Sequence, residues 1–171
     1  THRENMSFFS GKVVIVTGSS NGIGRGTAVL FAKAGAKITI TGRNANSLAV
    51  CRYKRVINAA DLRTMGLPGD ITDESFNANL ITSTADKFGR LDILVSYVLS
   101  LEFCTAFPLR TLNDPFYIYR TVRLSQLAVP YLEKTKGAIV NVSSIAKSAL
   151  DQITVQMAGS LMKKGIRVNS V

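Results

Sequence analysis

Three glycines, Gly18, Gly22 and Gly24, follow the apolar run "VVIV" of residues 13–16 and surround the start of a helix-like segment near Ile23. A glycine-rich turn between a buried strand and a helix lets the backbone approach a pyrophosphate, whose negative charge faces the positive end of the helix dipole. The pattern alone is weak, because a purely structural turn uses the same glycines. Its place between a strand and a helix favours a dinucleotide-phosphate site.

The end of the second expected strand indicates which dinucleotide is bound. The strand "AKITITG" is followed by Arg43 and Asn44, with no carboxylate at this point. An NAD-binding domain usually places a carboxylate here, which accepts a hydrogen bond from the ribose 2′-hydroxyl and repels a 2′-phosphate. Arginine is instead a forked, charged donor suited to phosphate. We therefore expect NADP(H), with NAD(H) the less favoured cofactor; a solvated surface arginine is the alternative interpretation of Arg43.

Composition favours one globular domain without a metal site. The chain has 171 residues, of which 46% are hydrophobic and 19% charged, and it contains no apolar run long enough to cross a membrane. We therefore expect a cytoplasmic protein. Cys51 and Cys104 have no neighbouring ligand cluster, and the only histidine is His2, so neither a histidine-based zinc site nor a Ser-His-Asp triad can form in the body of the chain. Residues 1–5, "THREN", are either a leader or expression remnant before Met6 or genuine N-terminal residues.

The formal net charge of +10 raises the question of an anionic partner, either nucleic acid or a phosphorylated ligand. Lysine and arginine are spread along the chain, and short clusters such as "RYKR" have no aromatic residues interleaved for bases to stack on. The charge alone does not decide between the two, and without such a motif we expect no specific nucleic-acid partner.

Strand-like and helix-like segments alternate along the whole chain. Strands are expected at 13–17, 36–42, 91–100, 138–144 and 166–171, and helices at 23–34, 45–60, 73–89 with Thr72 as the cap, 107–136 and 146–164. A further strand within 62–72 is poorly defined, because Gly66, Pro68 and Gly69 are unsuited to a central strand. The alternation predicts one α/β domain over 1–171, with a doubly wound parallel sheet of Rossmann type in three α/β/α layers.

Seven segments together resemble the short-chain dehydrogenases/reductases of the classical type: "VVIVTGSSNGIGRGTA", "ITITGRN", "GDIT", "FGRLDILV", "GAIVNVSS", "KSALDQ" and "GIRVNSV". The resemblance implies hydride transfer between a nicotinamide dinucleotide and an alcohol or carbonyl substrate, and it leaves a homo-oligomer open. It implies that the residues around the cofactor phosphates are Gly18, Ser20, Asn21, Gly22, Ile23 and Gly24. It also implies that Asp70 and Ile71 hold the adenine, although Asp70 is equally readable as a helix-capping carboxylate.

The resemblance identifies Ser144 as the serine that polarises the substrate oxygen and Lys147 as the lysine that binds the cofactor and lowers the pKa of a catalytic tyrosine. That tyrosine stands four residues before the lysine in the family, and here the position is Ser143. None of the five tyrosines, at 53, 97, 117, 119 and 131, has lysine four residues later. The general acid is therefore missing from the chain as written.

Other departures from the family pattern occur at "SYVL", residues 96–99, which replaces Asn-Asn-Ala-Gly and predicts a tighter site, and in the helix before the fifth strand, which lacks the relay asparagine. The chain also stops at Val171, so the resemblance implies that the C-terminal part of the family fold is absent. Three accounts follow: an incompletely represented NADP(H)-dependent oxidoreductase, an inactive relative that keeps dinucleotide binding or serves as a partner subunit, and a basic nucleic-acid-binding protein.

Overall fold

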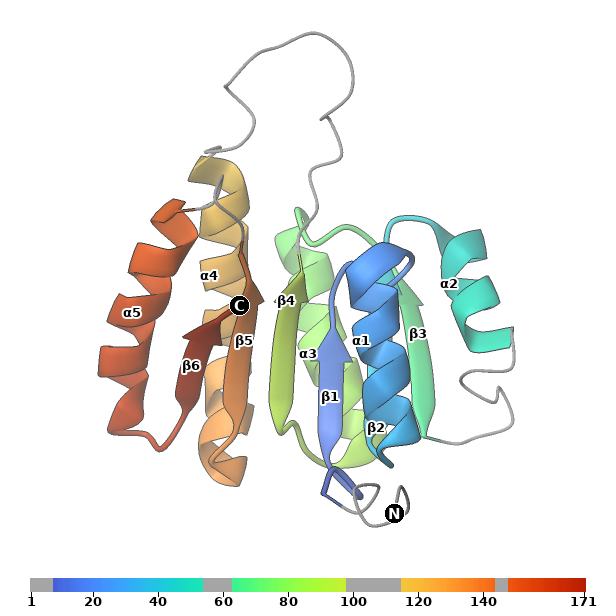
Figure 1. Cartoon of the computed structure of the whole chain (residues 1–171), viewed down its shortest axis with the longest axis horizontal. Helices are drawn as coiled ribbons and strands as arrows, with labels where there is room; N and C mark the ends of the chain where they lie inside the picture. The colour runs from blue at the N-terminus through green and yellow to red at the C-terminus, as the bar shows by residue number, and fades with distance from the viewer. Residues whose placement is uncertain (1–7, 54–62, 98–114, 144–147) are drawn as a thin grey trace, which may run out of the picture.

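The computed structural model describes residues 8–53, 63–97, 115–143 and 148–171, which form a parallel sheet between two helical layers (Figure 1). The six strands have the order β3-β2-β1-β4-β5-β6. The elements in chain order are β1 Val13–Val16, α1 Gly22–Lys33, β2 Lys37–Gly42, α2 Ala45–Tyr53, β3 Thr64–Pro68, α3 Glu74–Phe88, β4 Ile93–Tyr97, α4 Pro115–Thr135, β5 Ala138–Val142, α5 Ser148–Met162 and β6 Arg167–Ser170. This arrangement confirms the doubly wound α/β/α fold predicted from the alternation of elements.

The central strand β1 is buried on both faces, which explains its uninterrupted β-branched sequence. Val13 and Ile15 belong to a core cluster with residues of α3, α4 and α5, whereas Val14 and Val16 belong to a second cluster with residues of α1 and α2. The two helical layers therefore cover opposite faces of the sheet. Within the described residues, no helix is long and apolar enough to span a membrane.

The position of β3 in the sheet explains why its sequence is poor in strand-forming residues. It pairs with β2 alone and forms one edge of the sheet, with Pro68 as its last residue opposite Gly42. Proline is tolerated at a sheet edge and at a strand end, because no ladder hydrogen bond is lost there. Gly66, Pro68 and Gly69 are unsuited to a central strand, but β3 does not occupy a central position.

The expected cap of helix α3 is wrong by one residue. Asp73, not Thr72, is the N-cap: its Oδ1 accepts a hydrogen bond from the backbone N of Ser75 at 2.8 Å. Thr72 lies in the preceding turn, where its backbone N donates to Oδ1 of Asp70 at 2.9 Å. The helix ends before Gly89, whose φ of 79° places it in the left-handed region that favours glycine.

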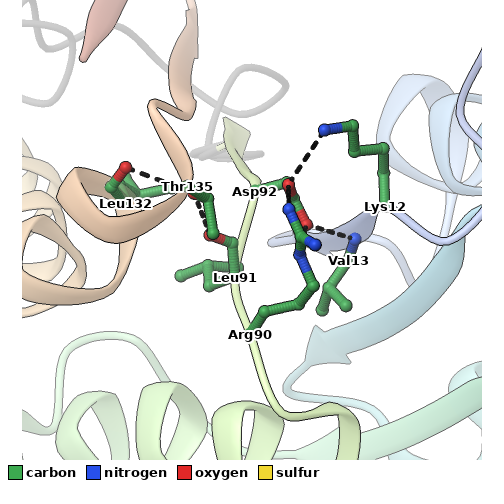
Figure 2. Close-up of polar contacts among 7 residues, drawn as sticks. All are labelled: Lys12, Val13, Arg90, Leu91, Asp92, Leu132 and Thr135. Carbon is green, nitrogen blue, oxygen red and sulfur yellow. Dashed lines mark hydrogen bonds and ion pairs between the residues drawn. The ribbon is translucent and has the colours of Figure 1, made fainter. Parts of the chain in front are cut away.

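A buried carboxylate ties the amino-terminal ends of β1 and β4 together (Figure 2). Asp92 is 3% exposed. Its Oδ2 accepts from the backbone N of Val13 at 3.0 Å, and Arg90 donates to both carboxylate oxygens, at 2.8 Å and 2.6 Å. The ammonium of Lys12 lies 3.3 Å from Oδ1. Burial by itself raises the pKa of Asp92, but the hydrogen bonds from Arg90 and from the Val13 amide outweigh it, so the pKa lies below its ordinary value.

Replacement of Asp92 by Asn is expected to lower the free energy of unfolding by about 2 kcal/mol, because the charge-assisted bonds to Arg90 and Lys12 are lost in a buried setting. Urea denaturation measures the effect. The matched control is Asp86→Asn, which removes an exposed carboxylate of α3 and should change stability by less than about 0.5 kcal/mol. An equal loss in both variants would contradict the assignment.

The stability contribution of Asp92 should depend on pH in one direction. Because its folded pKa is depressed, the contribution is complete above its ordinary value of 3.8 and is lost as the pH falls from there through the folded pKa. The stability difference between the native chain and Asp92→Asn should therefore be constant near neutral pH and shrink below about pH 4. A difference that grew on acidification would have the wrong sign.

Candidate functional site

The turn between β1 and α1 is anchored to the end of β2 through Ser19. The backbone N of Ser19 donates to the carbonyl of Thr41 at 3.0 Å, and the Ser19 hydroxyl accepts from the backbone N of Thr41 at 2.9 Å. The same hydroxyl donates to the carbonyl of Val16 at 2.9 Å. This buried serine fixes the turn at the carboxyl end of the sheet, where ligands of doubly wound folds bind.

The three glycines of the turn have different structural roles. A Cβ at Gly18 would lie 2.4 Å from the carbonyl oxygen of Tyr97, and a Cβ at Gly24 would lie 2.4 Å from the carbonyl oxygen of Gly18, so both positions require close backbone packing. Gly22 has a φ of 54°, and a Cβ built there would meet nothing within 4 Å. The middle glycine therefore faces open space, and the outer two allow the turn to pack.

The start of α1 presents hydrogen-bond donors without partners. The side chain of Asn21 caps the helix by accepting from the backbone N of Gly22 at 2.9 Å. Across the described part of the chain, the backbone amides of Ile23 and Gly24 donate to no other group, and the first turn contains no acidic residue. These two amides and the helix dipole can receive an anion. The side chain of Ile23 is exposed.

Arg43 and Asn44 lie directly beside this turn, because a Cβ at Gly42 would be 2.9 Å from the hydroxyl of Ser20. The Arg43 side chain is exposed and has no ion pair with the described residues. Asn44 has a local role, since its Oδ1 accepts from the backbone N of Ser47 at 2.9 Å at the start of α2. Arg43 is thus an exposed cation beside the glycine turn.

Asp70 and Ile71 follow β3, at the same end of the sheet. The backbone N of Gly69 donates to the carbonyl of Gly42 at 3.1 Å, which joins this segment to the end of β2. Oδ1 of Asp70 accepts from Thr72, and the carbonyl of Ile71 accepts from Nδ2 of Asn77 at 2.9 Å. The structure therefore brings the residues expected at the adenine to the same edge as the glycine turn, with Asp70 in a turn rather than in the capping role of α3.

Ser144 and Lys147 lie outside the described residues, in the segment between β5 and α5. The residue before them, Ser143, is held at the end of β5 by its backbone N, which donates to the carbonyl of Val171 at 2.7 Å. In the described ranges, no group of His, Cys, Asp and Glu side chains is arranged to hold a metal ion. The geometry thus places the open start of α1 and the exposed Arg43 at one edge of the sheet, and the binding and catalytic assignments stay predictions.

Comparison with known proteins assigns the chain to one family. The sequence pattern of the family described as short chain dehydrogenase matches residues 12–171. The chain belongs to the short-chain dehydrogenase family. It is 35% identical over 182 residues to an uncharacterised oxidoreductase, YhdF, of Bacillus subtilis, covering 94% of this chain and 62% of that protein. It is 30% identical over 183 residues to L-fucose dehydrogenase of Rattus norvegicus, covering 95% of this chain and 65% of that protein.

Solved structures of short-chain dehydrogenases and related enzymes agree with this fold. Glucose dehydrogenase of Caenorhabditis elegans superposes with a TM-score of 0.83 at 38% identity, covering 96% of this chain and 74% of that one. L-sorbose reductase of Gluconobacter frateurii, solved with NADPH and L-sorbose, superposes with a TM-score of 0.81 at 26% identity, covering 97% of this chain and 70% of that one. The chain spans less than two thirds of the length of the curated relatives named above.

Proposed function

We propose that this short-chain dehydrogenase is an NADP(H)-dependent oxidoreductase that transfers hydride between the cofactor and an alcohol or carbonyl substrate. The observation that carries the proposal is the open glycine turn, in which the amides of Ile23 and Gly24 have no partner among the described residues and Arg43 lies alongside. The family uses nicotinamide dinucleotides, and the similarity to a reductase solved with NADPH supports the choice of cofactor.

The residues of this edge fit the parts of such a cofactor. The amides of Ile23 and Gly24 would receive the pyrophosphate, the open approach at Gly22 would admit it, and Arg43 would pair with a 2′-phosphate. Asp70 and Ile71 would lie on the adenine side. A bound cofactor would supply or accept the hydride. Ser144 is proposed to polarise the substrate oxygen, and Lys147 is proposed to bind the cofactor.

Replacement of Arg43 by Ala is expected to weaken NADPH binding about tenfold and to leave NADH binding unchanged, because one charge-assisted contact to the 2′-phosphate is lost. Titration by isothermal calorimetry with both dinucleotides measures this. Arg167→Ala is the matched control, since Arg167 is an exposed arginine of β6 remote from the turn. Equal affinity of the native chain for NADPH and NADH would count against the assignment of Arg43.

The missing tyrosine favours a second candidate function, in which the protein binds the dinucleotide but does not catalyse hydride transfer. The two candidates share the cofactor site and differ only in turnover. The cytoplasmic location and a homo-oligomeric state stay predictions from the sequence and the family.

A further inference from the structure

Tyr97, the last residue of β4, is locked beside the glycine turn through its backbone. The hydroxyl of Thr17 accepts from the backbone N of Tyr97 at 2.9 Å and donates to its carbonyl at 3.1 Å. The backbone N of Thr17 donates to the carbonyl of Val95 at 3.0 Å. One threonine thus fixes both polar groups of the Tyr97 backbone, and Tyr97 itself is only 6% exposed.

The ring of Tyr97 packs against the two outer glycines of the turn. Its Cδ1 would lie 3.0 Å from a Cβ at Gly18 and 3.1 Å from a Cβ at Gly24. The open glycine, Gly22, has no such neighbour. The bulk of Tyr97 is therefore taken up in packing on the outer glycines rather than facing the approach at Gly22.

We propose that Tyr97 is a positioning residue for the dinucleotide: its ring supports the glycine turn and holds the amides of Ile23 and Gly24 in the orientation that receives the pyrophosphate. The inference rests on the proposed function. Without the ring, the turn would lose the packed surface under both Gly18 and Gly24 and would have to be ordered by the ligand, which costs affinity.

This role differs from that of Arg43 in a measurable way. NADPH and NADH share the pyrophosphate, so a change in the turn should weaken both by the same factor. Arg43 acts on the 2′-phosphate, which only NADPH has. Loss of Tyr97 should therefore lower both affinities and preserve their ratio, whereas loss of Arg43 should change the ratio.

The test compares Tyr97→Ala and Tyr97→Phe in the full chain by calorimetric titration with NADPH and with NADH. Tyr97→Ala should weaken both dinucleotides about tenfold, since the turn is no longer preorganised. Tyr97→Phe keeps the ring and should retain native affinity within about twofold. If Tyr97→Ala does not fold by circular dichroism, Tyr97→Leu, which keeps apolar volume without the ring, is expected to show the same loss.

A matched core variant separates positioning from general destabilisation. Leu132→Ala removes a fully buried side chain of α4, in the core cluster on the opposite face of the sheet from α1, and should lower thermal stability without weakening either dinucleotide. Native affinity in the folded Tyr97→Ala or Tyr97→Leu variant would overturn the inference, and so would an equal loss of affinity in Leu132→Ala. Failure of the native chain to bind either dinucleotide would instead contradict the proposed function.

Discussion

The native 171-residue chain is expected to oxidise NADPH with carbonyl substrates at only a residual rate, about 10²- to 10⁴-fold below that of a variant with a family-like tyrosine segment inserted before Lys147. Ser144 can polarise a carbonyl oxygen, but no tyrosine stands four residues before Lys147 to transfer the proton. The factor is the usual contribution of general acid catalysis. Absorbance at the reduced nicotinamide band, followed with a carbonyl panel, measures both rates.

Ser144→Ala in the inserted variant is the control, because it keeps the tyrosine and removes the group that polarises the substrate. It should return the rate to the residual level. Brisk turnover by the native chain that is abolished by Ser144→Ala would show that another residue supplies the proton. That outcome would contradict the account of the missing acid and exclude the binding-only relative as well.

Gly18→Ala is expected to reduce NADPH affinity about 30-fold or more. Alanine at this left-handed position would be strained and would clash with the backbone, at a cost of about 2 kcal/mol, so the turn would have to change shape. Gly18 has a φ of 60°, and a Cβ built there would lie 2.4 Å from the carbonyl oxygen of Tyr97. This oxygen belongs to the backbone, so a side-chain rotation cannot relieve the clash. Titration with NADPH measures the loss.

Gly26→Ala is the matched control for this prediction. Gly26 lies in α1, where a Cβ would meet nothing within 4 Å, and alanine in a helix interior is favoured over glycine by about 1 kcal/mol. This variant should bind NADPH as the native chain does and be slightly more stable. Equal binding by Gly18→Ala and Gly26→Ala would show that the turn does not hold the cofactor.

The fold was predictable from the sequence wherever local patterns and tertiary context agree. The β-branched run of β1 and the alternation of strand-like and helix-like segments belong to this class. The prediction was poorest for β3, because the sequence does not show that this strand is at the edge of the sheet, where Pro68 is tolerated. The cap of α3 is Asp73 rather than Thr72, because the Asp73 carboxylate accepts from the backbone N of Ser75.

The candidate site was predictable in its composition but not in its internal contacts. The glycine spacing indicated the turn, but it did not predict that the ring of Tyr97 packs on Gly18 and Gly24. The buried role of Asp92 was also missed. The available signal was a carboxylate placed between Arg90 and an apolar strand, which requires a partner when it is buried.

The most direct test of the central claim is a nitrogen-edited NMR titration of the isotope-labelled chain with NADPH. The account predicts saturable shifts of the backbone amides of Gly22, Ile23 and Gly24, with further shifts at Arg43 that NADH does not produce. Saturable NADPH binding that leaves the amides of the glycine turn unchanged would contradict the account, as would a titration in which the full chain shows no binding at all.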